Sequence, residues 1–453
     1  MFSPNSPVYE GATLLFPMGP GVTVPYEYTG WQDEILASKS SAWIGTALTT
    51  QSPTYDVKGP DLVKFFNSIC VNDFSGLTDK GIRHAIICNE KGQILTDSVV
   101  HKIAEDCIRT YWLMPVIDWL VKERGMQVEG ISMAGKLFFI QIEGEKSLEI
   151  TETACESDLH DIKFGAHCIA KIAGVEVRIL RLGMSGNLAY EVHGDIKDFD
   201  IVYQKIWEAG KQFGAKKLGF HTYSNFNHTE AGFPNINLHY PLPWYETSGL
   251  AEYLADKPML GFNNLNRRLR GSVGNDLESR FVTPYDNDWG SRVKFNHEFT
   301  GRAALEKIAK NPPRKVVTLE WNADDVGAVY AAQFRGKVEV CERIDHPSDV
   351  AFQENMTGGP GEGFIYRADK VLAEGKQVGI AVGRIVSAYY HTMISLAYLI
   401  PEHAVEGKEL TLIWGTPGTP QKEIRVKVAR YPYLDPKFVR NEKRDVSDIP
   451  RRF

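Results

Sequence analysis

The sequence predicts an α+β protein with two or three domains. Strand-like and helix-like segments alternate, but the chain lacks the long strand–helix–strand series of a doubly wound sheet. A chain of 453 residues usually forms more than one hydrophobic core, and so more than one domain. After the turn-forming Asn311-Pro312-Pro313 the pattern changes to strands. We therefore predict a first region at residues 1–310 and a second at 315–453.

In the first region, apolar spacing and turn residues define the elements in order. Residues 1–25 are rich in Pro and Gly and predict an extended arm. Leu62, Phe65 and Phe66 have the spacing of a helix face. Helices are predicted at residues 31–41, 59–69, 119–123 and 199–213. Strands are predicted at residues 84–88, 94–102, 108–114, 138–141, 172–182 and 188–193.

An aromatic segment, Leu238–Pro284, precedes the second region. It contains Tyr240, Trp244 and Tyr253, and it is long for a connection inside a compact domain. Its aromatic content predicts either a wall or lid on a substrate site or an oligomer contact. The second region then reads almost entirely as strands, at residues 316–321, 337–340, 378–387, 394–399 and 407–412.

Composition excludes several classes of partner. The net charge of -6 provides no positive field for a polyanion, so nucleic acid is not expected to bind. None of the six cysteines forms a Cys-x-x-Cys pair, and no apolar run reaches the roughly 20 residues that span a bilayer. We expect a soluble cytoplasmic protein, without membrane association, whose oligomeric state the sequence leaves open. The mixed-charge residues 440–452 predict a solvated terminus.

Two stretches about a hundred residues apart carry most of the functional information. Residues Arg178–Gly194 read as a strand, a Gly183-Met-Ser-Gly186 turn and a second strand with one carboxylate, Glu191, among apolar neighbours. Such a carboxylate either faces solvent from a half-buried strand or accepts hydrogen bonds from a ligand with paired N–H groups. Residues Asp288–Glu306 form the second stretch and contain Phe299-Thr-Gly-Arg302.

Together, and in this order, these stretches resemble the folate-binding aminomethyltransferase family, typified by the T-protein of the glycine cleavage system. Lys91–Val100, with its central Asp97, resembles that family's Gly-Gly-Ile-Leu-Asp-Asp strand, and Thr229-Glu-Ala-Gly232 resembles its Leu-Glu-Ala-Gly. The resemblance implies a T-protein-like fold of three domains around a central cofactor channel, with a C-terminal β-barrel. It also implies a methyltransferase that uses tetrahydrofolate.

Within the family, the closest resemblance is to the tetrahydrofolate-dependent vanillate and syringate O-demethylases. Val317–Val326 looks like the vanillate enzyme's Val-Thr-Leu-Ala-Trp-Asn-Gly-Asp-Asp segment. This implies transfer of a methyl group from a methoxylated aromatic compound to N5 of tetrahydrofolate. Aminomethyl transfer fits less well, because Thr96-Asp97 stands where the T-protein has Asp-Asp. An S- or N-demethylase of the same family and a non-catalytic folate-binding protein remain alternatives.

The resemblance also assigns roles to single residues. Glu191 matches the glutamate that binds the pterin ring, and Tyr190 beside it is predicted as a second cofactor contact. Asp97 matches the aspartate near the reactive folate nitrogen, with a part in both binding and catalysis. Tyr223 falls where the vanillate enzyme has a tyrosine implicated in catalysis. No metal is expected, because the histidines lack zinc-ligand spacing.

Two positions depart from the vanillate enzyme on the predicted substrate side. Leu113 stands where that enzyme has an arginine, and Gln51 stands where it has one of two paired histidines. The loss of these cationic groups predicts that neutral methoxyphenols, or acids whose carboxylate is anchored elsewhere, are better donors than vanillate.

Overall fold

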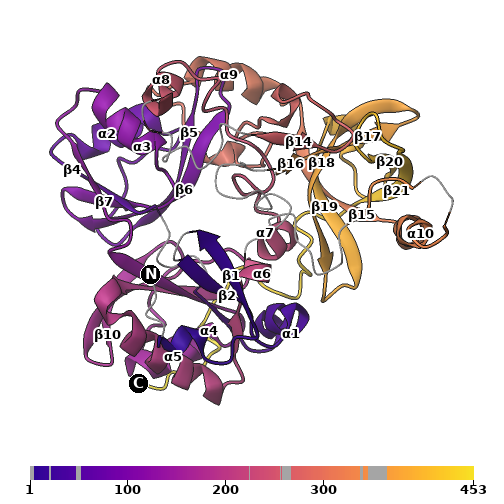
Figure 1. Cartoon of the computed structure of the whole chain (residues 1–453). Helices are drawn as coiled ribbons and strands as arrows, with labels where there is room; N and C mark the ends of the chain where they lie inside the picture. Colours follow the sequence, from indigo (N-terminus) through magenta and orange to yellow (C-terminus); the bar gives the residue numbers. More distant parts are fainter. Residues whose placement is uncertain are drawn as a thin grey trace.

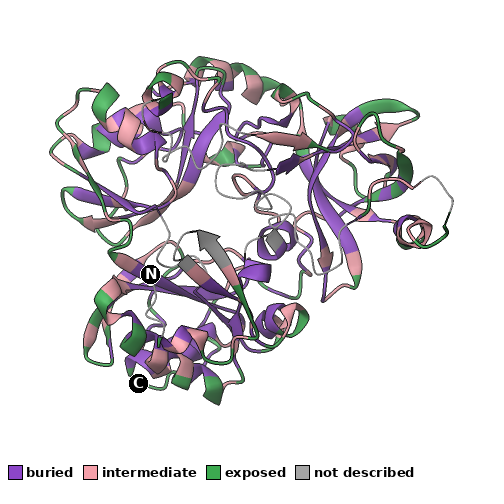
Figure 2. Cartoon of the chain, in the orientation of Figure 1, coloured by how far each residue is buried: buried purple, intermediate pink, exposed green. Residues whose placement is uncertain are grey.

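The computed structural model describes residues 5–19, 22–46, 53–223, 225–255, 257, 267–336, 340–344 and 365–453. Three bodies surround a central space (Figure 1). They are a first lobe with a five-stranded sheet, a second lobe with a six-stranded sheet, and a closed six-stranded barrel. Each body has a buried interior of its own (Figure 2). The predicted α+β class and the C-terminal barrel are confirmed.

The first lobe is an antiparallel sheet covered by helices. The strand order is β5 (Ile82–Cys88), β6 (Ile94–Ala104), β7 (Cys107–Thr110), β4 (Tyr55–Lys58) and β8 (Glu129–Ser132). Helices α2 (Leu62–Ile69), α3 (Val116–Glu123), α8 (Leu250–Ala255) and α9 (Arg302–Lys310) supply apolar side chains to the same core. Phe65 and Phe66 of α2 are fully buried, as their helix-like spacing predicts.

The second lobe carries the longer sheet. Its strand order is β10 (His167–Ile172), β11 (Val175–Leu180), β12 (Ala189–Asp195), β9 (Leu137–Glu143), β3 (Trp43–Gly45) and β13 (Lys216–Leu218). Helices α4 (Ser147–Cys155) and α5 (Phe199–Gln212) share a core with one face of this sheet. The opposite face of β9 and β12 lines the central cavity described below.

The barrel closes in the order β15 (Lys315–Trp321), β19 (Thr392–Leu399), β18 (Lys376–Ser387), β17 (Asp369–Ala373), β20 (Glu409–Trp414) and β21 (Lys422–Ala429). Helix α10 (Ala323–Ala332) contacts its outside at β21. Strand β16 (Ile365–Arg367) pairs in parallel with β14 (Arg268–Arg270), which joins the barrel region to the aromatic segment. Most of the predicted strand at 337–340 lies outside the described residues.

The N-terminal residues are more ordered than the sequence predicted. In place of an extended arm, β1 (Leu14–Gly19) and β2 (Val22–Glu27) form an antiparallel hairpin in which Phe16 lies opposite Val24. Apolar residues Leu14–Phe16 precede the Gly-Pro-Gly at 19–21 and the β-branched Val22-Thr-Val24 follows it, which favours this pairing over an isolated extended strand. The predicted helix at residues 31–41 is present as α1 (Trp31–Leu36) and a 3-10 turn, Ala37–Lys39.

The C-terminal segment, residues 430–453, leaves the barrel and returns to the second lobe (Figure 1). Val446 and Ile449 belong to the core of that lobe, and the Arg181 guanidinium donates to the carbonyl oxygens of Asn441 and Arg444. Most of residues 440–452 are exposed, as predicted, but Asn441, Val446 and Ile449 are buried and anchor the segment. Its charged residues flank apolar anchors that a count of charges does not reveal.

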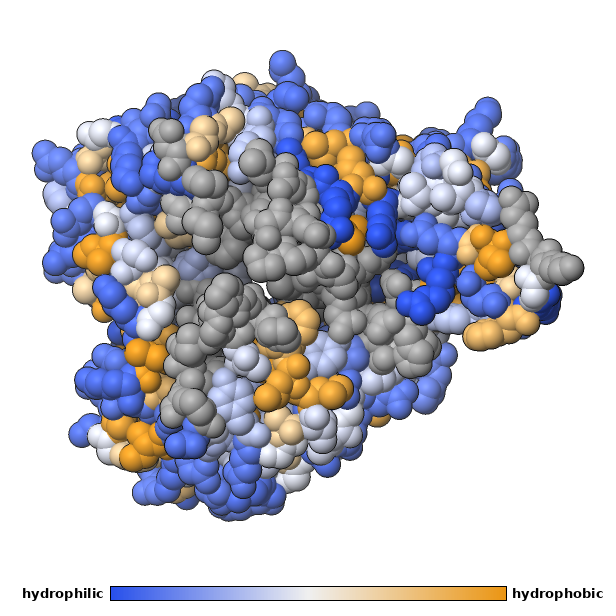
Figure 3. Space-filling model, in the orientation of Figure 1, coloured by the Kyte–Doolittle hydropathy of each residue, from blue (hydrophilic) through white to orange (hydrophobic). Residues whose placement is uncertain are grey.

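Among the described residues, no helix combines the length and the apolar character needed to cross a membrane. The molecular face in Figure 3 is largely hydrophilic at its periphery, with separate apolar patches. Exposed apolar side chains include Leu14, Leu15 and Phe334. Scattered residues of this kind are normal on soluble proteins.

Candidate functional site

The site is a central cavity of about 1110 Å³. Its wall comes from both lobes, from the loop after α7 (Asn225–Ala231), and from the C-terminal segment at residues 440–442. Single-ligand pockets usually measure about 300–1,000 Å³. The cavity therefore has room for two small molecules side by side, as a transfer between a donor and an acceptor requires.

Glu191 faces this cavity from β12. Strand β12 pairs with β9 so that Glu191 lies opposite Gln141. The Gln141 Nε2 donates to one carboxylate oxygen at 2.8 Å, and the His193 Nε2 lies 2.8 Å from the other. His193 is two residues along the same strand and so shares the face of Glu191.

The hydrogen bonds fix the protons around Glu191. Tyr111 lies 2.7 Å from the His193 Nδ1, and burial raises the pKa of Tyr111, so its neutral hydroxyl donates to this nitrogen. The His193 Nε2 then carries the proton and donates to Glu191. Each carboxylate oxygen accepts one bond from the protein and keeps a second acceptor site. Glu191 is thus a forked acceptor for a ligand with two adjacent N–H donors.

Tyr190 does not join Glu191 in the cavity. Successive side chains on a strand point to opposite faces, and Tyr190 packs in the core of the second lobe with Ile142 and Tyr203. It is fully buried there and is not part of the cavity lining. The predicted cofactor contact at Tyr190 does not agree with this position.

Asp97 faces the cavity from the other lobe. One carboxylate oxygen lies 2.6 Å from the His84 Nε2, and the other accepts a hydrogen bond of 2.7 Å from the Tyr240 hydroxyl. The Arg292 guanidinium contacts the second ring nitrogen of His84. Asp97 is 7% exposed and belongs to the cavity lining.

Tyr223 belongs to the Glu191 side of the cavity. It ends helix α6 (Phe220–Tyr223), and its hydroxyl donates to the Gln141 Oε1. The amide of Gln141 therefore connects Tyr223 to Glu191. Buried Glu34 fixes the start of α6 by accepting the backbone N–H of Gly219 at 2.7 Å. Burial raises the pKa of Tyr223 well above its usual value, so the hydroxyl is a neutral donor.

Tyr240 is the part of the aromatic segment that reaches Asp97. It is 1% exposed, and Trp244 nearby donates to the Leu95 carbonyl oxygen at 2.7 Å. Among the described residues of Leu238–Pro284, Leu238 lines the cavity. The segment thus supports the cavity wall from behind. Its predicted role as a substrate wall or lid remains a proposal.

The basic side chains of the cavity come from other positions than the two that the sequence analysis placed on the substrate side. Leu113 is fully buried in the first-lobe core and does not line the cavity, and Gln51 lies outside the described residues. Four basic side chains line the cavity instead: Arg83, Arg292, Lys294 and Arg440. Leu113 therefore does not decide whether a donor can carry a carboxylate.

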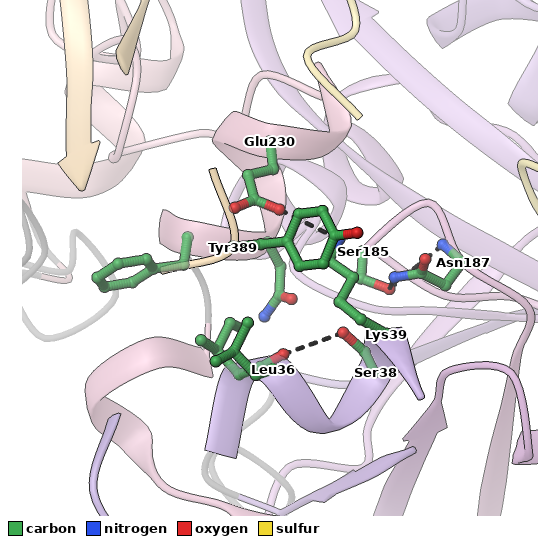
Figure 4. A pocket seen from close by; sticks show the side chains of 10 residues that line it. Leu36, Ser38, Lys39, Ser185, Asn187, Glu230 and Tyr389 are labelled. Atoms are coloured by element: carbon green, nitrogen blue, oxygen red, sulfur yellow. Dashed lines mark hydrogen bonds and ion pairs between the residues drawn. The ribbon is translucent and has the colours of Figure 1, made fainter. Parts of the chain in front are cut away.

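Glu230, in the Thr229-Glu-Ala-Gly232 motif, has a structural role. It pairs with Lys39 at 3.2 Å and accepts a 2.6 Å hydrogen bond from Ser387 at the end of β18. Figure 4 shows Glu230, Lys39 and Tyr389 around a space of about 10 Å³, which holds at most one water molecule. This cluster joins the second lobe to the barrel and is too small for a ligand.

One group among the described residues has the composition of a metal site: Glu152, Asp158 and His160. The His160 Nδ1 lies 2.8 Å from Glu152 and 3.0 Å from Asp158, and its Nε2 lies 2.9 Å from the Ile449 carbonyl oxygen. These contacts raise the pKa of His160 against the opposing effect of its burial. A protonated histidine that anchors the C-terminal segment explains all three contacts. None of these residues lines the cavity.

Sequence reasoning missed the residues that surround the two carboxylates. His193 was within reach, because it stands two positions after Glu191 on a predicted strand. Gln141 was not, since it requires the register between β9 and β12. His84, Tyr240 and Arg292 come from separate parts of the chain, and no spacing in the sequence relates them to Asp97.

A family model and several known proteins are similar to this chain. A model of the GCVT N-terminal domain matches residues 14–238. The sesamin methylene transferase of Sinomonas sp. is 52% identical over 94% of both chains. The syringate O-demethylase of Sphingobium sp. is 28% identical over 92% of this chain and 91% of its own. The solved glycine cleavage system aminomethyltransferase T of Bartonella henselae matches the fold with a TM-score of 0.65, at 16% identity over 96% of both chains.

The residues present fit tetrahydrofolate, the cofactor of the aminomethyltransferase family. Its pterin ring offers adjacent N–H and amino donors, which the free acceptor sites of Glu191 complement as a forked pair. Arg83 and Lys294 bond to backbone carbonyl oxygens, of Asp73 and Ser291, which leaves their charge available to the carboxylates of the glutamyl tail. With 52% identity over nearly its whole length to one member, this chain belongs to the folate-binding aminomethyltransferase family and is a tetrahydrofolate-dependent methyl-transferring enzyme.

Proposed function

We propose that the protein transfers a one-carbon unit from an ether oxygen of an aromatic compound to tetrahydrofolate. The observation that carries this proposal is the pair of buried carboxylates on one cavity, Glu191 as a forked acceptor and Asp97 as a charged group held by two donors. Apolar side chains of the cavity wall suit an aromatic donor: Phe233 lies beside the His84 ring, and Pro234 and Ile236 follow it in the lining.

Two donors are compatible with this chemistry. An aryl methylenedioxy ring is the first, because the relative at 52% identity is a sesamin methylene transferase and sesamin carries such rings. An aryl methoxyl group is the second, and the syringate O-demethylase at 28% identity supports it. The methoxyl donor is also what the resemblance to the O-demethylases predicted.

Tetrahydrofolate, when bound, supplies the nucleophile N5 and, for a methylene unit, also N10. A methoxyl donor loses its O–CH₃ bond, the carbon bonds to N5, and one proton passes from N5 to the departing oxygen. A methylenedioxy donor loses two C–O bonds to the same carbon, and two protons pass to a catechol. Asp97 would accept the proton on a carboxylate oxygen and return it to the departing oxygen, which makes it the catalytic acid and base. Glu191 would hold the pterin ring through its two carboxylate oxygens and so fix the orientation of the nucleophile.

Tyr223 would act through Gln141. Its hydroxyl is committed to the Gln141 Oε1, whose amide in turn donates to Glu191. We therefore assign Tyr223 the positioning of the pterin acceptor, in place of the catalytic role expected from the resemblance.

The test of the function is a donor panel. Purified protein is incubated with tetrahydrofolate and, separately, with 1,3-benzodioxole, guaiacol, vanillate, dimethylsulfoniopropionate or methylated glycines. Mass spectrometry then distinguishes methylene- from methyl-tetrahydrofolate. We expect products from aryl ethers, and methylene-tetrahydrofolate from the benzodioxole. Turnover confined to the sulfonium or amine donors would overturn the proposal, and the Glu191→Ala variant controls for reaction outside the cavity.

Tyr223→Phe separates positioning from catalysis. The change keeps the ring but removes the donor to Gln141, so the amide should hold Glu191 less firmly. Loss of one such neutral hydrogen bond corresponds to about 0.5–1.5 kcal/mol, or roughly 2- to 12-fold in the Kd of tetrahydrofolate, with kcat changed less. A kcat lowered about 10²- to 10³-fold at unchanged folate affinity would instead restore the catalytic role.

A further inference from the structure

Arg292 lies in the Asp288–Glu306 stretch and lines the cavity, but neither the cofactor fit nor the donor site gives it a role. It ends a short 3-10 turn, Gly290–Arg292. The guanidinium lies 5.7 Å from the Phe233 ring centre and 5.9 Å from that of Trp289. Its hydrogen-bond partner is the His84 Nδ1.

His84 and Asp97 are placed by the pairing of β5 with β6. His84 lies opposite Val99 and Asp97 lies two residues before Val99, so the two side chains are diagonal neighbours on one face. The His84 ring is held edge-on against Trp289, with ring centres 4.7 Å apart at 89°. The imidazole therefore has little freedom to turn away from Asp97.

The proton on His84 can be placed by elimination. A guanidinium has N–H donors and no acceptor, so the His84 Nδ1 must accept from Arg292 with its lone pair. The single proton of a neutral imidazole is then on Nε2, which faces the Asp97 carboxylate at 2.6 Å. The Tyr240 hydroxyl donates to the other oxygen. Both oxygens of Asp97 thus accept from neutral donors.

We propose that Arg292 is a positioning residue that keeps His84 neutral, with its N–H on Nε2, and that through His84 it holds Asp97 as an unprotonated, oriented base. A protonated His84 would neutralise the Asp97 carboxylate at close range and lower its basicity. Arg292 prevents this by occupying the nitrogen that would take the second proton. The inference rests on the proposed role of Asp97 in moving a proton.

The charges around His84 agree with this arrangement. Burial and the positive charge of Arg292 lower the pKa of His84, while Asp97 acts in the opposite direction. The titratable and charged groups that act on this cluster come from several elements: Asp97 on β6, Arg292 on its 3-10 turn, Tyr240, Cys88 on β5, His228 on α7, and Arg440 and Glu442 in the C-terminal segment. Removal of Arg292 leaves Asp97 as the nearest charge, so the pKa of His84 should rise.

The test is the pH dependence of Arg292→Met. Methionine keeps the apolar contact with Phe233 and Trp289 but cannot donate to His84. Protonation of His84 should then inhibit turnover as the pH falls, so kcat at about pH 6 should be about tenfold below kcat at about pH 8. The wild-type enzyme should lack this inflection. Arg292→Lys, which keeps the charge, should recover the wild-type profile in part, and the double variant with His84→Asn should lose the new inflection.

A matched control is Arg425→Met, since Arg425 pairs with Asp325 on the outside of the barrel. Its pH profile should equal that of the wild type. A uniform loss of kcat at every pH in Arg292→Met would overturn the proposal and leave Arg292 with a structural role.

A second readout does not depend on turnover. In ¹⁵N-histidine NMR spectra, the resonances that vanish in His84→Asn identify His84 among the 12 histidines. At about pH 6 they should show the neutral Nε2–H tautomer in the wild type and an imidazolium in Arg292→Met. An imidazolium or an Nδ1–H tautomer in the wild type would refute the inference. Failure of the donor panel with these NMR signatures intact would reject the proposed function alone.

Discussion

Replacing Glu191 with alanine should weaken tetrahydrofolate binding by on the order of 2–4 kcal/mol, or about 30- to 900-fold in Kd. The pterin N–H and amino donors would lose their charged partner while remaining inside the cavity. Gln141 and His193 would each lose the acceptor to which they now donate, which weakens the alignment of the remaining groups. Glu191 is 8% exposed and belongs to the cavity lining, so the fold should survive.

Isothermal titration with tetrahydrofolate measures the effect, and thermal unfolding monitors the fold. Glu176→Ala is the matched control, because Glu176 is an exposed residue of the neighbouring strand β11. Glu191→Gln is the second comparison. Glutamine keeps the side-chain size but loses the charge and one acceptor. The affinity of this variant for tetrahydrofolate should therefore lie between those of the wild type and Glu191→Ala. Wild-type affinity in Glu191→Ala would reject the pterin assignment.

The larger features of this fold were predictable from local patterns together with the family resemblance. The pattern after residue 315 predicted a strand at 316–321, and the resemblance implied barrel strands at 378–387 and 394–399. Strands β15, β18 and β19 occupy these positions. Glu191 and Asp97 could be proposed because a short motif carries each of them. A motif reports the residue that acts, but it does not report the partners that fix that residue's proton or orientation.

Tyr190 could have been excluded from the site by the alternation along its strand. Residues Ala189–His193 of β12 are all buried, because one face meets the core and the other lines the cavity. Glu191 and His193 share the cavity face, whereas Tyr190 and Val192 share the core face. The partner of Glu191 on the next strand, Gln141, was not predictable in this way because it depends on the pairing with β9.

The partners of Asp97 could not be found from the sequence for a different reason. His84 precedes Asp97 by 13 residues, Tyr240 follows it by 143, and Arg292 is 208 residues from His84. The contact of His84 with Asp97 depends on the register of the β5–β6 pair. The contacts of Tyr240 and Arg292 arise when separate segments close on one another, and no local spacing encodes them. The C-terminal segment is a similar case, because Asn441 reaches the cavity only after the chain has completed the barrel and returned.

Asp97→Asn should lower kcat by about 10²- to 10⁴-fold, the usual contribution of a positioned acid and base. Asparagine keeps the size of the side chain and can still accept from the His84 Nε2. Its amide N–H₂ would face Tyr240, whose hydroxyl can rotate to accept, so the buried hydrogen bonds remain satisfied. The variant cannot take up or return the transferred proton. The Kd of tetrahydrofolate should change by less than about threefold, since binding depends chiefly on Glu191.

Single-turnover kinetics with an aryl ether donor, folate titration and thermal unfolding together decide the role of Asp97. Asp106→Asn is the matched control, because the Asp106 side chain is 52% exposed in the turn between β6 and β7. A variant whose kcat and Kd both stay within about twofold of wild type would make Asp97 an ordinary strand residue. A collapse of the melting temperature would make its role structural, because the bonds from His84 and Tyr240 would then be needed to hold β5 and the aromatic segment against β6. Loss of turnover in a folded protein that still binds folate is the outcome that a proton-carrying Asp97 requires.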